Sequence, residues 1–317
     1  MKKWLFLRGE LDANNLRNVV DNTDMWIQLF EGLVGQFDTG DVWFKHKKRG
    51  SVKSVSGLHI IHSTPEDLIK KRLLNINLSD YTHVFARGGF DYYLPILERC
   101  TNAFKIRYGA GKRFKPESTS FYYDLVLVDT ELQKQRIIWH DHWHKDKIRL
   151  LIKPAAINFK PVEVKKEFDL CYIANIQQKV IKGVQFVYTH VPKDMSVLHL
   201  GHYERSKFIP KNLKRKRVER TEMPVEISRC KVGIIPYDNT DSCPRALVEM
   251  MACGLPIVAF DSVNVSDLYR KKIKIVQKKN FWDAVREMLN NPIHDVAEYY
   301  QNNLSIEKAS NHLIGML

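Results

Sequence analysis

The stretch KVGIIPYDNTDSCPRALVEMMACGLPIVAFD, from Lys231 to Asp261, decides the fold. An apolar run comes first, a polar turn leads into a segment with apolar residues at helical spacing, and a second apolar run ends the stretch. Pro244 suits the first turn of a helix, and Gly254 followed by Pro256 ends it. The pattern therefore predicts one strand-helix-strand crossover of a parallel sheet.

Two carboxylates frame the predicted helix. Asp241 lies in the turn before it, and Glu249 lies inside it after seven intervening residues. Ligands of open α/β sheets bind outside the carboxyl ends of the strands, where a helix N-terminus favours an anion. We therefore expect Asp241 and the start of the helix to face such a crevice. The residues expected to contact an anion there are Ser242, Cys243, Pro244 and Arg245.

This stretch resembles the donor-site signature of retaining family 4 glycosyltransferases, the glycosyl transferases group 1 of the GT-B fold. In that family two acidic residues separated by seven others flank a helix start with a small residue and proline, and precede a segment like MACGLPIV. Glu249 matches the second acid, and Asp241 stands where the family usually has glutamate. The resemblance implies that Glu249 binds the nucleotide ribose and that Asp241 binds hydroxyls of the donor sugar.

Basic and small residues elsewhere extend the resemblance. Lys182 matches the lysine of a Lys-Gly pair that holds the donor diphosphate, and Lys179 is a candidate substitute for the family's arginine. Gly9 occupies the loop after the first strand, which touches donor phosphate and acceptor in the family, and Arg113 ends a small-residue loop that suits phosphate. Family members usually carry a histidine near the end of a later strand, but Tyr108 stands in that region, so we assign no catalytic histidine.

The length of 317 residues is comfortable for two domains, and 44% hydrophobic residues without a low-complexity tract indicate a globular chain. We predict an α/β protein with two Rossmann-like doubly wound domains facing a cleft, as in GT-B. The expected domains are an acceptor-side domain over residues 1–160 and a nucleotide-sugar domain over residues 161–300. Residues 301–317 are expected to form a helical segment that packs back on the N-terminal domain.

The formal net charge of +14 predicts a basic surface that attracts polyanions. The densest cluster is KNLKRKRVER, from Lys211 to Arg220, which we interpret as a polar loop suited to phosphates. A solvated basic face is the simpler interpretation of any single cluster. The segment Met25 to Phe30 offers exposed aromatics for a membrane surface or, equally, residues for the core.

The chain should remain in the cytoplasm, either free, peripheral to the inner membrane, or as a viral protein in a host cell. The apolar run after Met1 is too short for a signal peptide, and no run of eighteen apolar residues occurs. Five cysteines without a CxxC pair indicate reduced thiols. His140 and His144 have the spacing of a shared helix face, but a polar helix end is favoured over zinc, and we expect no metal site.

We therefore expect a glycosyltransferase that moves a hexose or pentose from a nucleoside-diphosphate sugar, in the first place a UDP-sugar, to an acceptor hydroxyl with retention. Asp241 and Lys182 take the catalytic roles, and no tightly bound cofactor or divalent metal is expected to be required. The acceptor is a modified base in DNA or, nearly equally, lipopolysaccharide or another envelope glycan at a membrane. A catalytically degenerate sugar-nucleotide or nucleic-acid binding protein and an unrelated doubly wound enzyme remain alternatives.

Overall fold

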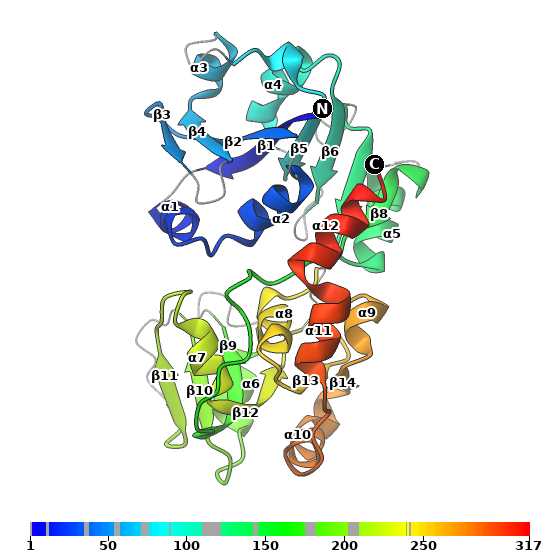
Figure 1. The fold of residues 1–317 in the computed structure, drawn as a ribbon. Helices are drawn as coiled ribbons and strands as arrows, with labels where there is room; N and C mark the ends of the chain where they lie inside the picture. The colour runs from blue at the N-terminus through cyan, green and yellow to red at the C-terminus, as the bar shows by residue number, and fades with distance from the viewer. Residues whose placement is uncertain are drawn as a thin grey trace. The chain divides into compact units, whose positions relative to one another are not determined.

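The structure is a computed structural model that describes residues 2–10, 13–34, 38–53, 58–70, 76–88, 90–109, 122–141, 145–174, 182–201, 209–238, 240 and 242–317. The chain divides into two compact units (Figure 1). The N-terminal unit contains residues 1–152 and 309–317, and the C-terminal unit contains residues 153–308. Each unit is an α/β domain built on a largely parallel sheet, which confirms the predicted fold class.

The sheet of the N-terminal unit has the order β3-β4-β2-β1-β5-β6-β7-β8. All neighbouring strands are parallel except β3 and β4, which are antiparallel. The strand order reverses between β1 and β5, as in doubly wound folds. The strands are β1 (Lys3–Glu10), β2 (Thr39–Lys45), β3 (Gly50–Lys53), β4 (His59–Ser63), β5 (His83–Arg87), β6 (Phe104–Tyr108), β7 (Leu125–Val128) and β8 (Ile148–Leu150).

Helices connect these strands, because a parallel pair needs a crossover. The α-helices are α1 (Ala13–Val20), α2 (Met25–Val34), α3 (Pro65–Ile69), α4 (Leu94–Arg99) and α5 (Glu131–Asp141). Three short 3₁₀ helices, η1 (Leu78–Asp80), η2 (Asp91–Tyr93) and η4 (Lys145–Lys147), add single turns. Helix α12 (Ile306–Ile314) starts in the C-terminal unit and ends in the N-terminal one.

Helix α2 belongs to the core of the N-terminal unit. Every residue from Met25 to Phe30 is buried, and the rings of Phe6 and Phe30 stack with centroids 3.9 Å apart. Residues 309–317 join this core, where Gly32 leaves room for Ser310: a Cβ at Gly32 would lie 2.3 Å from Ser310 Oγ. Of the two interpretations left open for this segment, the core is correct and the exposed membrane surface is wrong.

The sheet of the C-terminal unit has the order β11-β10-β9-β12-β13-β14, and all its strands are parallel. Counted within the unit, this is 3-2-1-4-5-6, the strand order of a dinucleotide-binding fold, which reverses between β9 and β12. The strands are β9 (Phe168–Ile173), β10 (Val197–Leu200), β11 (Leu213–Lys216), β12 (Cys230–Ile235), β13 (Ile257–Phe260) and β14 (Ile273–Val276). The helices are α6 (Val184–His190), α7 (Met223–Ser228), α8 (Arg245–Ala252), α9 (Asp267–Arg270), 3₁₀ helix η6 (Lys278–Asn280), α10 (Phe281–Asn290) and α11 (Val296–Leu304).

The crossover predicted from residues 231–261 is confirmed as β12, α8 and β13. One detail differs: Pro244 is the N-cap residue rather than part of the first turn. Its ψ of 128° is extended, so the helix begins at Arg245. The helix ends at Ala252, and Gly254 adopts a φ of +79°, the left-handed conformation typical after a helix C-terminus.

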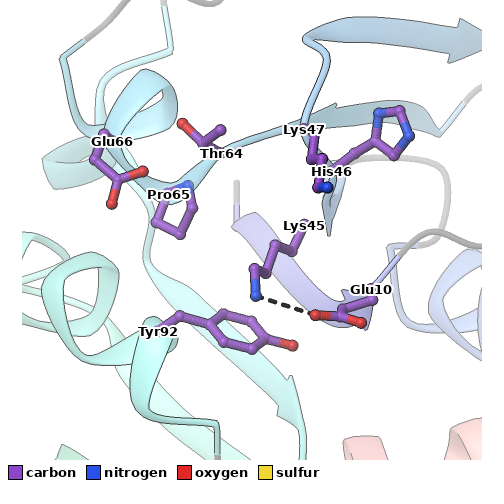
Figure 2. Close-up of a pocket in the computed structure, with 8 residues that line it drawn as sticks. All are labelled: Glu10, Lys45, His46, Lys47, Thr64, Pro65, Glu66 and Tyr92. Carbon is purple, nitrogen blue, oxygen red and sulfur yellow. Dashed lines mark hydrogen bonds and ion pairs between the residues drawn. The ribbon is translucent and has the colours of Figure 1, made fainter.

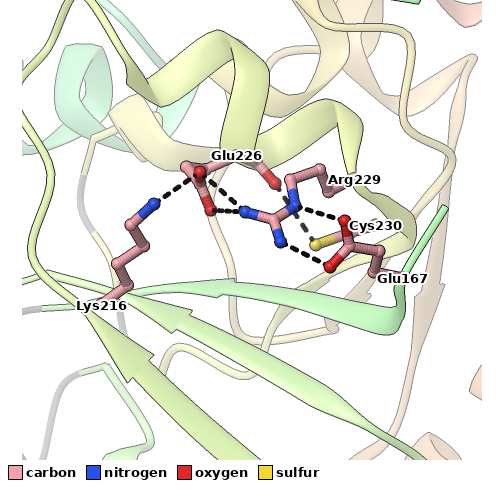
Figure 3. Close-up of polar contacts among 5 residues, drawn as sticks. All are labelled: Glu167, Lys216, Glu226, Arg229 and Cys230. Atoms are coloured by element: carbon pink, nitrogen blue, oxygen red, sulfur yellow. Dashed lines mark hydrogen bonds and ion pairs between the residues drawn. The ribbon is translucent and has the colours of Figure 1, made fainter. Parts of the chain in front are cut away.

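The basic run from Lys211 to Arg220 is only partly a loop, and this prediction needs correction. Residues 213–216 form the edge strand β11, which pairs with β10. Lys216 Nζ lies 2.7 Å from the buried Glu226, whose carboxylate also accepts two hydrogen bonds from Arg229 (Figure 3). Arg229 also pairs with Glu167 at 2.5 Å. Parallel pairing uses only the backbone, so a strand with basic side chains forms at the sheet edge, and part of its charge is neutralised.

Two further observations concern the cysteines and the lengths of the helices. All five cysteines are buried and none forms a disulfide. Within the described part of the chain, no helix is both long and apolar enough to cross a membrane.

Candidate donor site of the C-terminal unit

The candidate site lies where the strand order of the C-terminal sheet reverses. Strand β12 leads through Pro236 and Tyr237 to the start of α8, and Lys182 and Gly183 begin α6 after β9. Because β9 and β12 are parallel neighbours, their carboxyl ends meet at the same edge of the sheet. The fold therefore brings segments from both sides of the reversal together at this edge.

Glu249 is the most buried acid of the site. Its side chain on α8 is 3% exposed, and Arg220 Nη2 lies 2.8 Å from its Oε1. The Arg220 guanidinium also lies over the ring of Phe159, 5.0 Å from the centroid. The backbone carbonyl of Arg220 accepts a hydrogen bond from Asn158 Nδ2 at 3.0 Å. A buried carboxylate requires such a partner, because unpaired charge is costly away from water. Arg220 therefore holds Glu249 in one orientation.

Lys182 is electrostatically coupled to two other predicted site residues. Burial lowers the pKa of the Lys182 ammonium, Glu249 opposes that shift, and Arg245 adds to it. The ammonium also lies 5.6 Å from the ring centroid of the buried Tyr237. Lys182 therefore lies near enough to Glu249 and Arg245 for their charges to act on it, and Arg220 already pairs with the carboxylate of Glu249. An anion is the ligand that this arrangement favours.

The turn that presents Lys182 needs a glycine. Gly183 is the N-cap of α6 with a φ of +65°, and a Cβ there would lie 2.0 Å from the carbonyl oxygen of Pro236. The carbonyl of Lys182 accepts a hydrogen bond from Tyr172 Oη at 2.7 Å, which anchors the turn to β9. Close packing of this turn against the residues that follow β12 fixes the backbone at Lys182.

The segment before α8 is held by hydrogen bonds from neighbouring loops. Lys153 Nζ donates to the carbonyl of Cys243 at 3.0 Å, and Asn264 N donates to Thr240 Oγ1 at 2.9 Å. Pro244 accepts the first helical hydrogen bond, from Leu247 N at 3.1 Å. The amides of Arg245 and Ala246 precede this bond and have no intrahelical acceptor, so they can contact a ligand at the helix start. The side chain of Cys243 is buried.

The remaining predicted residues, which are Asp241, Lys179, Arg113 and Gly9, are not among the residues described above. Asp241, Lys179 and Arg113 lie outside the described residues. Gly9 belongs to the other unit, where it has a φ of +93° in β1. The sequence did not single out Arg220 as the partner of Glu249, and its only signal was its place at the end of a basic run. Among the described residues, no group of three or more His, Cys, Asp or Glu side chains has the arrangement of a metal site.

Comparison with known proteins identifies this unit. Residues 167–291 match the family model described as Glycosyl transferases group 1, and this range contains Lys182, Arg220 and Glu249. The C-terminal unit therefore carries the sequence pattern of group 1 glycosyltransferases. No curated protein sequence matches it at a significant level.

Solved structures show that this chain has the GT-B fold. A sucrose-phosphate synthase from Thermosynechococcus elongatus matches with a TM-score of 0.68 at 13% identity, covering 100% of this chain and 98% of that one. A glycosyltransferase from Rickettsia africae gives 0.68 at 12% identity, with 99% and 97% covered. HepE from Anabaena in complex with UDP-glucose gives 0.68 at 9% identity, with 100% of both chains covered. The shared feature is the presence of two parallel-sheet domains.

Proposed function

We propose that this glycosyltransferase transfers a sugar from a UDP-sugar to an acceptor hydroxyl with retention of the anomeric configuration. The observation that supports the proposal is the cluster of Lys182, Arg245 and Glu249 beside the start of α8, within the segment that matches the family. The UDP-glucose bound to Anabaena HepE, a protein of the same fold, makes UDP-sugars the first donors to test.

Each residue of the cluster has a role that follows from the charge of the donor. The bond between the anomeric carbon and the diphosphate oxygen breaks with both electrons going to the diphosphate, and negative charge grows there. Lys182, Arg245 and the amides at the start of α8 stabilise that charge. Glu249, oriented by Arg220, accepts hydrogen bonds from the ribose hydroxyls, and Asp241 binds hydroxyls of the sugar.

The acceptor oxygen bonds to the anomeric carbon on the face that the diphosphate leaves, and its proton passes to the departing diphosphate oxygen. This step needs no protein base, which agrees with Tyr108 standing where family members carry histidine. Cations of the protein provide the counter-charge, so we also propose that no divalent metal is required. Turnover in the presence of EDTA tests this point.

The acceptor that the net charge favours is a polyanion, either DNA with a modified base or an envelope glycan. The support for DNA rests on charge alone, and two cations of the densest cluster, Lys216 and Arg220, are already paired with Glu226 and Glu249. The cytoplasmic location belongs to the same proposal, since five buried free thiols suit a reducing compartment.

The test is donor turnover by the purified chain with a panel of nucleoside-diphosphate sugars, with and without duplex DNA carrying hydroxymethylated pyrimidines. We expect UDP release from a UDP-sugar, with a loss of about a hundredfold or more in Glu249→Ala and Lys182→Ala. Glu226→Ala is the matched control, because it also breaks a buried ion pair but lies outside the site. No release from any donor would contradict the proposal and favour a degenerate binding protein.

A further inference from the structure

Lys153 is the first residue of the C-terminal unit, and its ammonium group lies at the start of helix α8. Lys153 Nζ donates a hydrogen bond to the carbonyl of Cys243 at 3.0 Å, across 90 positions of the sequence. Cys243 directly precedes Pro244, the N-cap residue of α8. The side chain therefore contacts the segment that leads to the unpaired amides of Arg245 and Ala246.

The peptide group between Cys243 and Pro244 requires a hydrogen-bond donor from elsewhere in the chain. Proline has no N–H, so this peptide group can accept a hydrogen bond but cannot donate one. Both residues are buried, and a buried carbonyl without a donor is costly. A charged donor such as the Lys153 ammonium forms a stronger hydrogen bond than a neutral one. Lys153 therefore fixes the direction of the Cys243 carbonyl.

The direction of this carbonyl also determines how α8 begins. The peptide group is planar, and the ring of Pro244 restricts its φ, which is −63°. Few rotations thus separate the Cys243 carbonyl from the amides of Arg245 and Ala246. A change in the direction of the carbonyl would turn these amides as well.

The backbone of Lys153 is held by a single tyrosine. Lys153 N donates to Tyr269 Oη at 2.9 Å, and Tyr269 Oη donates to the carbonyl of Lys153 at 2.8 Å. Tyr269 lies in α9 and is 1% exposed. Because this buried phenol already holds the backbone of Lys153, the side chain loses less conformational freedom when it binds Cys243.

We infer that Lys153 is a positioning residue for the donor diphosphate: it holds the Cys243 carbonyl and so directs the amides of Arg245 and Ala246 toward the phosphates. The inference rests on the proposed function, because it concerns the donor of the same transfer. It assigns the effect of Lys153 to the phosphates alone. The nucleoside should bind equally well without this lysine, because Glu249 is oriented by Arg220 and not by Lys153.

Lys166 offers a matched control within the same unit. Its ammonium donates to the carbonyls of Ser228 and Cys230, each at 2.8 Å. The chemistry is that of Lys153, a lysine bound to backbone carbonyls. However, Cys230 begins β12, whereas α8 follows the carboxyl end of that strand. A Lys166 variant therefore loses the same kind of hydrogen bond at the opposite edge of the sheet.

The experiment compares the full wild-type chain with four variants. Lys153→Met removes the donor to Cys243, and Lys153→Arg keeps a charged donor there. Tyr269→Phe releases the backbone of Lys153 without removing its charge, and Lys166→Met is the control. Calorimetry gives the Kd of UDP for each protein, and ligand-observed NMR gives the Kd of uridine, which has no phosphate. Thermal melting shows that each variant is folded.

We expect the Kd of UDP to rise about tenfold or more in Lys153→Met and about fivefold in Tyr269→Phe, with the Kd of uridine unchanged in both. Lys153→Arg should recover most of the UDP affinity, and Lys166→Met should match the wild type for both ligands.

Three results would overturn the inference while leaving the proposed function intact. The first is a wild-type Kd of UDP in Lys153→Met. The second is an equal loss of UDP and uridine affinity in that variant, which indicates general damage to the unit. The third is a wild-type Kd in Tyr269→Phe, which means that Lys153 acts through its charge and not by positioning. A wild-type chain that binds no UDP would contradict the proposed function, and the inference with it.

Discussion

Two ion pairs, one in each unit, have similar distances between their charged atoms but differ in their exposure to water. Arg220 and Glu249 in the donor site are 2.8 Å apart, with side chains 20% and 3% exposed. Lys45 and Glu10 in the N-terminal unit are 3.0 Å apart, with side chains 37% and 70% exposed (Figure 2). The distances are nearly equal, but water surrounds only the second pair. Breaking a buried pair leaves a charge away from water, while an exposed pair contributes little to stability.

The largest expected effect comes from breaking the buried pair. Glu249→Ala leaves the Arg220 guanidinium largely buried without a counter-charge, and we expect a loss of about 3 kcal/mol in the free energy of unfolding. Urea denaturation of the C-terminal unit's transition measures this loss. Replacing both partners together, Glu249→Leu with Arg220→Met, should recover part of the stability but none of the UDP binding. A single variant as stable as the wild type would show that the pair is not buried in solution.

Substitution of Gly183, the residue after Lys182, should give the next largest loss of stability. Gly183→Ala forces a side chain into the left-handed region and toward the Pro236 carbonyl, so we expect a loss of about 2 kcal/mol together with weaker UDP binding. Gly315→Ala is the matched control, because an added Cβ there meets only ordinary contacts at 3.5 Å or more. Equal melting temperatures for the two variants would exclude the close approach of the Lys182 turn to Pro236.

The pH dependence of UDP affinity tests whether the charge of Lys182 contributes to donor binding. Burial lowers the pKa of Lys182 in the free protein, and bound diphosphate stabilises the ammonium and raises that pKa again. Affinity should therefore be highest below the lowered pKa and fall as pH rises through it, by up to about tenfold per pH unit. Calorimetric titration above pH 7, where UDP is already ionised, measures the slope. A slope that persists in Lys182→Met would assign the titration to another group.

The exposed pair should give the smallest effect on stability. Glu10→Gln with Lys45→Met is expected to change the free energy of unfolding by less than about 0.5 kcal/mol, because exposed ion pairs contribute little. The same urea titration measures it, beside the Glu249→Ala variant. A loss as large as that of Glu249→Ala would mean that the two pairs are equivalent structural elements, and the comparison would fail.

Local pattern was enough to predict the elements with strong apolar runs. The β12-α8-β13 crossover follows from apolar runs and from glycine and proline signals. The edge strand β11 was missed, because its side chains are mostly basic and its pairing depends on β10. Apolar periodicity carries no information about a strand stabilised through its backbone.

The donor site was predictable as a set of residues but not as a set of contacts. Glu249 and Arg245 were proposed from the stretch of residues 231–261 and Lys182 from a separate Lys-Gly pair, and their roles as site residues stay a prediction. The pairing of Glu249 with Arg220 spans 29 positions and exists only after β11 and α7 have packed. Gly9 was expected to touch donor phosphate, but the consequence of its conformation is the direction of Glu10, which depends on the register of β1 against β2.

The contact of Ser310 with Gly32 has a consequence for biosynthesis. Residues 309–317 belong to the N-terminal unit, although the whole C-terminal unit separates them from it in sequence. On the ribosome, residues 1–152 must therefore wait for the synthesis of α12, and until then the face of α2 around Gly32 remains uncovered. The C-terminal unit is contiguous and can complete its core first. Thus the unit made first is the one finished last, and a chaperone has its longest opportunity to bind at helix α2.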